Sequence, residues 1–182
     1  RRDGDIETRM EIFVSVSNAT EVRRITLTNH SGDNHDIELT SYGELVITSG
    51  YADRHHPAFQ NLFVQTEWIA ERNAILAMRR PRSSENKPIW FGHTVSVADA
   101  IRPISCETNR THFIGRGRSV RNPAAMDNPG DLPGTVGAVL DPVFAIRART
   151  ARVVREGFSA LARRDPAARR GNGRGRRVRH RP

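Results

Sequence analysis

The 182-residue sequence has little of several features that define common protein classes. It contains one cysteine, Cys106, so no intramolecular disulfide can form, and we interpret this residue as a small buried side chain. No run of about 18 apolar residues is present, so we expect no membrane-spanning helix in it. No convincing helical stripe of apolar residues occurs before residue 145. These absences favour a globular domain made of strands.

Charge is distributed unevenly along the chain. The whole sequence has a net charge of +9, but residues 147–182 alone hold 13 arginines against two acidic residues, a net of +11. The first 146 residues carry 16 basic and 18 acidic residues, a net of −2. We therefore predict a single folded domain over residues 1–146 and an Arg-rich tail over residues 147–182. A nucleic-acid interpretation based on overall charge describes only that tail.

The clearest local pattern lies in residues 22–49. Ile25 and Leu27 alternate with polar residues, and Ile37 and Leu39 do the same after a polar run. Alternation on both sides of a turn-rich gap predicts two antiparallel strands with one buried face. We expect a hairpin here, followed by a third apolar run.

Other short apolar segments continue this pattern between polar, Gly- and Pro-rich loops. About eight short strands predict an all-β fold, an antiparallel β-sandwich. The expected strands outside the hairpin cover residues 10–16, 45–47, 58–69, 74–78, 89–97, 106–113 and 139–146. The expected loops cover residues 50–57, 79–88 and 115–137.

The tail differs in kind from the domain. Residues 147–164 place Val153, Val154, Phe158 and Leu161 at spacings that are a fair match to an amphipathic helix. The Arg- and Gly-rich run over residues 169–182 is of low complexity and is predicted to be disordered.

Four aromatic residues, Tyr42, Tyr51, Trp68 and Trp90, are able to stack on a sugar ring, and the last three are the candidates for binding carbohydrate. Sugar C–H groups pack on aromatic faces while polar groups bind the hydroxyls. Core packing is the alternative for Trp68, which ends an apolar run. Trp90 lies beside the polar loop over residues 79–88, so both interpretations remain open for it.

A glycine- and arginine-rich segment, residues 113–119 (FIGRGRS), supplies two further candidates, Arg116 and Arg118. Glycine allows a ligand to approach the backbone, and arginine binds phosphate or carboxylate through two hydrogen bonds. The segment matches neither common phosphate-binding loop motif, and an Arg-rich turn is the alternative.

No catalytic or metal-binding set is visible in the sequence. Glu44 and Asp141 adjoin apolar strands, but they form no recognisable pair for glycoside chemistry and are predicted to be structural. The adjacent His55 and His56 would not face one ion together from a strand, and no nearby residues complete a shell. We predict no catalytic residue, no metal and no cofactor.

Several of these segments together resemble a known family. Residues 22–31 and 37–42 are similar to the N-terminal β-sandwich of glycoside hydrolase family 94, formerly glycosyltransferase family 36. Residues 56–64 (HPAFQNLFV) and 79–82 (RRPR) resemble the bacterial cyclic β-1,2-glucan synthases within it.

Two later motifs extend this resemblance over about residues 1–150. Thr108, Asn109 and Arg110 with residues 113–118 resemble the family's T-D-R…F-x-G-R-G-R, with Asn109 in the Asp position. The run from Val136 to Ile146 resembles its G…L-D-P-x-x-x-L/I strand.

The resemblance implies an incomplete supersandwich of the galactose-mutarotase type, which binds carbohydrate and packs against an (α/α)₆ barrel. The catalytic acid and phosphate-binding residues belong to that barrel, so no catalytic residue is carried over. The implied partners are β-glucan and the barrel, with no specific nucleic acid. The implied parent is a bacterial inner-membrane protein, whereas this fragment would be cytoplasmic.

The resemblance ends after Ile146, where the sequence becomes rich in Arg, Ala and Gly. We expect the tail to be a frameshifted or otherwise aberrant end, and the chain to be a fragment inactive on its own. The alternative is a non-enzymatic binding protein whose basic tail engages nucleic acid or an anionic surface. Titrating nucleic acid into the chain with and without residues 147–182, and comparing the binding, distinguishes these hypotheses.

Overall fold

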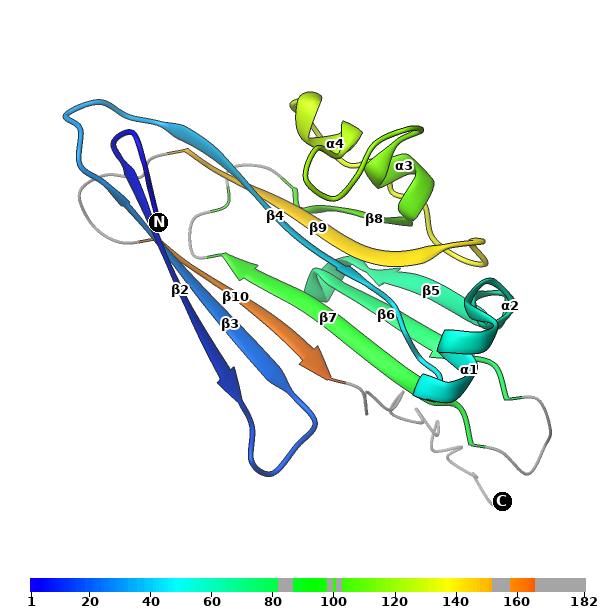
Figure 1. Ribbon diagram of the computed structural model, residues 1–182. Helices are drawn as coiled ribbons and strands as arrows, with labels where there is room; N and C mark the ends of the chain where they lie inside the picture. Colours follow the sequence, from blue (N-terminus) through cyan, green and yellow to red (C-terminus); the bar gives the residue numbers. More distant parts are fainter. Residues whose placement is uncertain (82–86, 98–99, 101–102, 152–157, 166–182) are drawn as a thin grey trace, which may run out of the picture.

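The computed structural model describes residues 1–81, 87–97, 100, 103–151 and 158–165, which form two antiparallel β-sheets packed face to face (Figure 1). The seven-stranded sheet has the order β1-β2-β3-β10-β7-β6-β5, and the three-stranded sheet has the order β4-β9-β8. The strands of the larger sheet are β1 (Arg2–Asp3), β2 (Ile6–Val14), β3 (Glu21–Asn29), β5 (Val64–Ile69), β6 (Ala74–Arg79), β7 (Ile89–Val97) and β10 (Phe158–Asp165). Those of the smaller sheet are β4 (Asp36–Glu44), β8 (Ser105–Asn109) and β9 (Pro142–Ala151). The short helices are α1 (Gly50–His55), α2 (Pro57–Asn61), η1 (Ala70–Arg72), α3 (Arg110–Ile114) and α4 (Ala124–Asp127). The predicted all-β sandwich is confirmed.

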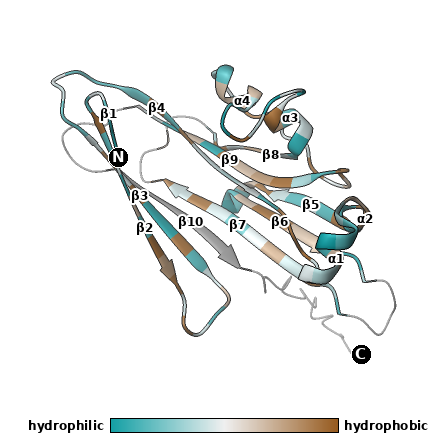
Figure 2. Ribbon diagram, in the orientation of Figure 1, coloured by the Kyte–Doolittle hydropathy of each residue, from teal (hydrophilic) through white to brown (hydrophobic). Residues whose placement is uncertain are grey.

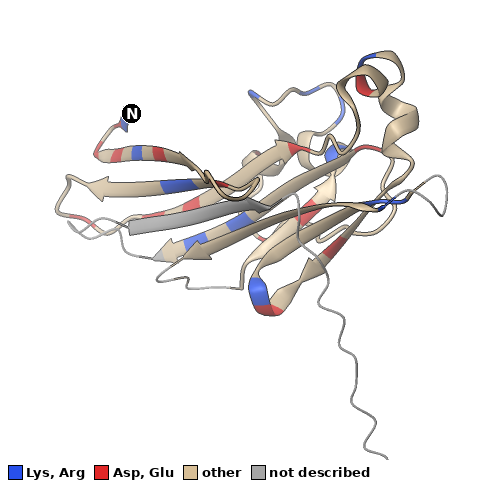
Figure 3. Ribbon diagram, turned by 90° about the horizontal axis from the view of Figure 1, so that it is seen from below, with Lys and Arg blue, Asp and Glu red and all other residues tan. Residues whose placement is uncertain are grey.

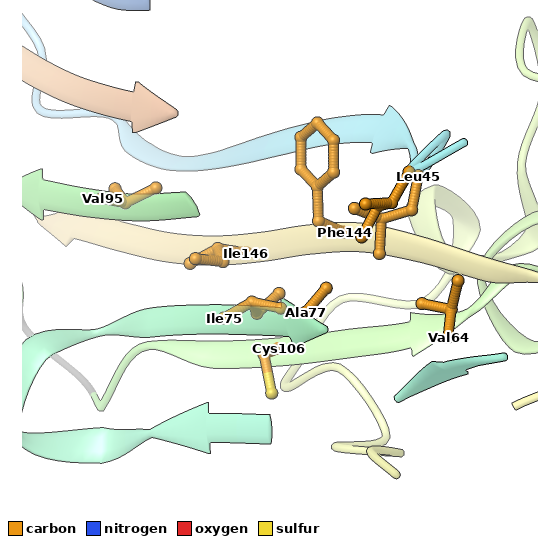
Figure 4. Packing of buried hydrophobic residues seen from close by; sticks show 9 residues of the cluster. Leu45, Val64, Ile75, Ala77, Val95, Cys106, Phe144 and Ile146 are labelled. Atoms are coloured by element: carbon orange, nitrogen blue, oxygen red, sulfur yellow. The ribbon is translucent and has the colours of Figure 1, made fainter. Parts of the chain in front are cut away.

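The main core lies between the two sheets. Ile75 and Ala77 of β6 point inward and are fully buried, whereas Leu76 between them points outward, as alternation along a strand requires. Phe144 and Ile146 of β9 meet them from the smaller sheet (Figure 4). The buried members of this cluster are Leu45, Ile47, Val64, Ile75, Ala77, Val95, Cys106, Phe144 and Ile146.

Strand β9 is buried on both of its faces. Phe144 and Ile146 face the larger sheet, while Ala145 faces the other way and packs beneath Phe113 and Ile114 of α3. Figure 1 shows α3 and α4 lying over the outer face of this sheet. A strand covered on both sides has a near-continuous apolar sequence, which explains why this stretch lacks alternation.

Arg147 holds the α4 segment against β9. Its side chain is 3% exposed, and its guanidinium group donates hydrogen bonds to the carbonyls of Ala125 at 2.6 Å, Asn128 at 3.1 Å and Gly130 at 2.9 Å. It also donates to Thr40 Oγ1 on β4 at 3.0 Å. Burial lowers the pKa of this guanidinium group, but the carbonyls and Glu38 nearby compensate the charge.

The hairpin predicted over residues 22–40 is wrong. Strand β3 pairs with β2 and β10, whereas β4 pairs with β9 in the other sheet. The polar link crosses between the sheets, and Asn29 fixes its start by accepting from the Ser31 amide at 2.9 Å and donating to the Asp33 carbonyl at 2.7 Å. Alternation shows which face of a strand is buried, but it does not identify the neighbouring strand.

Several local predictions need smaller corrections. The strand predicted over residues 58–69 begins only at Val64, because Pro57–Asn61 form α2, and the loop predicted over residues 115–137 contains α4. Residues 45–47 are not a strand, although Leu45 and Ile47 are buried. The loop predicted over residues 50–57 contains α1, with Ser49 accepting from the Ala52 amide at its N-terminus. The strand predicted over residues 106–113 ends at Asn109, whose side chain caps α3.

The helix predicted over residues 147–164 is also wrong where the structure describes this stretch. Residues 147–151 continue β9, and β10 lies antiparallel between β3 and β7. The boundary predicted between residues 146 and 147 therefore falls inside a strand. Residues 152–157 and 166–182, which include most of the run predicted to be disordered, lie outside the described residues.

Strand β2 is covered least. Strand β1 pairs only with Ile6 and Glu7 of β2. Toward its end β2 is coloured brown in Figure 2, and the large apolar side chains in and just after this part are exposed. These exposed side chains are Met10, Ile12, Phe13, Val14 and Val16. Both signs of charge are spread over the strands and loops in Figure 3. No helix in the described part of the chain is long and apolar enough to cross a membrane.

We expect Arg147→Met to lower the free energy of unfolding by about 3 kcal/mol, because it leaves buried carbonyls without a donor. The matched control is Arg149→Met, on the same face of β9, where the arginine is partly exposed and pairs with Glu38. The free energy of unfolding of Arg149→Met should fall by only about 1 kcal/mol. Urea unfolding followed by circular dichroism measures both, and equal midpoints would contradict the role of Arg147.

Candidate functional site

A hollow of about 460 Å³ lies on the face of β5, β6 and β7 that points away from the core. The strand register places Met78 beside Gln65 on one side and beside Trp90 on the other, which forms a row across three strands. The residues that line the hollow are Gln65, Thr66, Glu67, Leu76, Met78, Trp90 and Gly137. Its floor is therefore aromatic and apolar, with amide and carboxylate groups at the β5 side.

Trp90 faces outward because its neighbour Phe91 is required in the core. Phe91 packs against the buried cluster, and its ring centroid lies 5.1 Å from that of Phe144. Alternation then turns the half-buried Trp90 to the opposite face. Leu76 and Met78 alternate with Ile75 and Ala77 in the same way, which leaves two apolar side chains beside the indole.

The rim of the hollow at β5 is fixed by backbone hydrogen bonds. Thr66 and Gly137 exchange two of them, each at 2.9 Å, and the Thr66 hydroxyl lies 2.7 Å from that of Thr108. The Thr108 amide donates to the Thr135 carbonyl at 3.1 Å. The segment around residues 135–137 thus connects β8 of one sheet with β5 of the other and closes this side of the sandwich.

The other two predicted aromatic residues are not brought to this hollow. Trp68 packs on the inner side against the core cluster. Tyr51 is 69% exposed on α1, where its ring stacks on His55 with centroids 4.1 Å apart. His55 also contacts the Tyr51 carbonyl through Nδ1 at 2.8 Å. The described residues include no group of three or more His, Cys, Asp or Glu side chains that could hold a metal ion.

The glycine- and arginine-rich segment lies on the opposite side of the sandwich, over the smaller sheet. Arg118 forms an ion pair with Asp127 of α4, while Arg116 is exposed. Gly115 has a φ of +84°, and a Cβ atom there would lie 2.7 Å from the Cβ atom of Ala124. The glycine is required by this close approach between α3 and α4.

The two carboxylates noted in the sequence meet at a residue that sequence reasoning did not connect with them. Arg110 Nε lies 3.1 Å from Glu44 and 3.8 Å from Asp141. The hydroxyl of Tyr42 donates to Glu44 at 3.3 Å, and burial, assisted by that carboxylate, raises the pKa of Tyr42 to about 12. Burial also raises the pKa of Asp141 while Arg110 opposes the shift. The cluster links the end of β4, the start of β9 and α3. In the sequence, Arg110 and Asp141 lie in the two motifs that contain Thr108–Arg110 and Leu140–Pro142.

Comparison with known proteins gives the same fold assignment. The profile of the glycosyl hydrolase 94 supersandwich domain matches residues 1–152. The chain belongs to this family. The match continues six residues beyond Ile146 and so includes all of β9, and it confirms the resemblance found in the sequence.

Two curated relatives of this supersandwich domain are similar over most of the chain. The cyclic β-(1,2)-glucan synthase NdvB of Rhizobium meliloti (strain 1021) is 36% identical over 153 residues, which is 84% of the chain and 5% of that protein. The solabiose phosphorylase of Paenibacillus borealis is 26% identical over 129 residues, which is 71% of the chain and 15% of that protein. The supersandwich domain thus spans a small part of both relatives.

We expect Gly115→Ala to destabilise the fold by about 2–3 kcal/mol, because it combines a strained φ with a clash against Ala124. Gly117→Ala is the matched control, since Gly117 has a φ of +71° with nothing near its Cβ position. The free energy of unfolding of Gly117→Ala should fall by only about 1 kcal/mol. The difference between their thermal unfolding midpoints isolates the packing effect, and equal losses would contradict it.

Cys106 should react slowly with thiol reagents in the folded protein. Burial, with Glu107 beside it, raises the pKa of the thiol from 9.0 to about 11, so at pH 8 the thiolate is about 100-fold rarer than in the unfolded chain. Labelling with a disulfide reagent at pH 8, before and after denaturation, measures this ratio. Equal labelling rates in the folded and denatured protein would contradict the burial of the Cys106 thiol.

Proposed function

We propose that this supersandwich domain binds β-glucan on the face that carries Trp90 and catalyses no reaction by itself. In this proposal it serves a carbohydrate enzyme of the cyclic β-1,2-glucan synthase type by holding the polymer. The observation that supports it is the hollow in which Trp90, Met78 and Leu76 form an apolar floor beside Gln65 and Glu67.

The chemistry of this floor suits a neutral sugar. An indole face and apolar neighbours pack against the C–H groups of a pyranose ring, while an amide and a carboxylate accept and donate at its hydroxyls. The volume of about 460 Å³ is within the range of ligand pockets. The glucan synthase relative is named for a cyclic β-(1,2)-glucan, so that polymer is the ligand to test.

The same hollow is poorly equipped for catalysis. Most glycoside hydrolysis requires two carboxyl groups on either side of the bond. Glu67 is the one carboxylate among the described residues that line the hollow. Glu44 and Asp141 are both engaged by Arg110 elsewhere. We therefore expect no release of glucose 1-phosphate when the chain is mixed with β-1,2-glucan and phosphate.

The remaining candidates stay predictions. Trp68 supports the sheet from inside, whereas Tyr51, Arg116 and Arg118 lie away from the hollow. Any contribution from these exposed residues would be a separate glucan contact. Each can be tested by the titration that tests Trp90.

We expect Trp90→Ala to weaken binding of cyclic β-1,2-glucan about tenfold, since the loss of one stacked ring is worth about 1.4 kcal/mol. Isothermal titration calorimetry measures this change, with Phe13→Ala as the control for an exposed aromatic residue away from the hollow. In a Trp68→Phe variant Trp90 is the remaining tryptophan, so its fluorescence should shift on glucan binding. Unchanged affinity in Trp90→Ala would refute the proposed site.

A further inference from the structure

Two sequence segments that the proposed glucan site does not use lie against each other around a second hollow. These are residues 56–64 (HPAFQNLFV) and residues 79–81, the described part of the RRPR motif, and the hollow between them has a volume of about 310 Å³. It is lined by Thr48, Ala52, Gln60, Arg79, Arg80, Pro81, Lys87 and Ile89. Three of these residues are cations, and none of the described lining residues is a carboxylate.

Arg79 is held rigidly at the base of this hollow. Its Nη1 and Nη2 atoms donate to the backbone and side-chain oxygens of Gln60, at 3.1 Å and 2.6 Å. The guanidinium carbon lies 5.2 Å from the ring centroid of Phe63, a cation–π contact. Gln60 is 6% exposed and also accepts from the Thr48 hydroxyl at 3.4 Å. The charge is therefore fixed in place before any ligand arrives.

Arg80 and Lys87 stand at the rim of the hollow. The Arg80 backbone amide donates to the Phe63 carbonyl at 2.9 Å, and its guanidinium group contacts the Leu62 carbonyl at 3.4 Å. The side chains of Arg80 and Lys87 are exposed, and no ion pair of either is found within the described part of the chain. Arg79, Arg80 and Lys87 together place three positive charges at this hollow. This positive charge lies in a domain whose first 146 residues have a net charge of −2.

We propose that this hollow binds the oxyanion of a small molecule, a phosphate group such as that of a sugar monophosphate. A fixed arginine flanked by two adjustable cations is an arrangement that matches phosphate oxygens. The volume is at the lower end of the range of small-molecule pockets, which suits one phosphorylated sugar.

The oxyanion site is separate from the proposed glucan site. Ile89 and Trp90 are neighbours in β7, but alternation turns them to opposite faces of the sheet, and no residue lines both hollows. The proposal therefore does not depend on glucan binding. Trp90→Ala should keep its affinity for phosphate, which allows either proposal to fail without the other.

The test uses the full chain with inorganic phosphate and with glucose 1-phosphate as probes, titrated by calorimetry at constant ionic strength against sodium chloride. The decisive variant is R80Q/K87Q, which changes two exposed side chains and leaves Arg79 and Gln60 in place. R72Q/R121Q is the matched control, because it removes the same charge from exposed arginines elsewhere. The single variant K87Q serves as a milder second case.

We expect saturable binding in the millimolar range that weakens at least tenfold in R80Q/K87Q and about threefold in K87Q, with R72Q/R121Q unchanged. Binding that chloride replaces equally, or that falls to the same extent in both double variants, would overturn the site. A parallel arm with vesicles of anionic or neutral lipid identifies the source of the oxyanion. Loss of vesicle binding in R80Q/K87Q without any binding of the free phosphates would overturn the small-molecule assignment.

Discussion

The structure depends on one strand that is buried on both sides. Strand β9 supplies Phe144 and Ile146 to the core between the sheets, while Ala145 and Arg147 of the same strand face the layer formed by α3 and α4. A strand in this position would ordinarily be apolar throughout. The chain places an arginine there, and it is tolerated because the α4 segment presents its carbonyls to the guanidinium group. The outer layer is therefore bound to the sandwich by charge as well as by packing.

This central constraint also determines which faces of the larger sheet stay open. The inner side chains of β6 and β7 are taken by the core, so Trp90, Leu76 and Met78 are left on the outer face. On the other side, α3 and α4 cover the smaller sheet and occupy the space over β9. An open, apolar surface with polar neighbours is thus left on the outer face of β5, β6 and β7.

The sequence predicted the faces of the strands better than their neighbours. Alternation at Ile25 and Ile37 identified two strands correctly, but the pairing of β3 and β4 with strands distant in the sequence leaves no local signal. The charge change at Arg147 suggested a boundary because the carbonyls that compensate a buried arginine are invisible in a linear sequence. The pairing of Arg110 with Glu44 and Asp141 was missed for the same reason, since these carboxylates lie 66 and 31 positions away in the sequence.

The candidate site followed a similar rule. Of the aromatic residues chosen from the sequence, Trp90 lies in a hollow because Phe91 next to it is required in the core, and Trp68 lies on the inner face by the same alternation. The apolar run before Trp68 and the polar loop before Trp90 already pointed in these two directions. Glu44 and Asp141 adjoin apolar strands, as a catalytic pair would, yet Arg110 lies against both and ties the end of β4 to the segment before β9. Burial raises the pKa of Asp141 while Arg110 opposes that shift, so these contacts act first on how the two strands and α3 are held together.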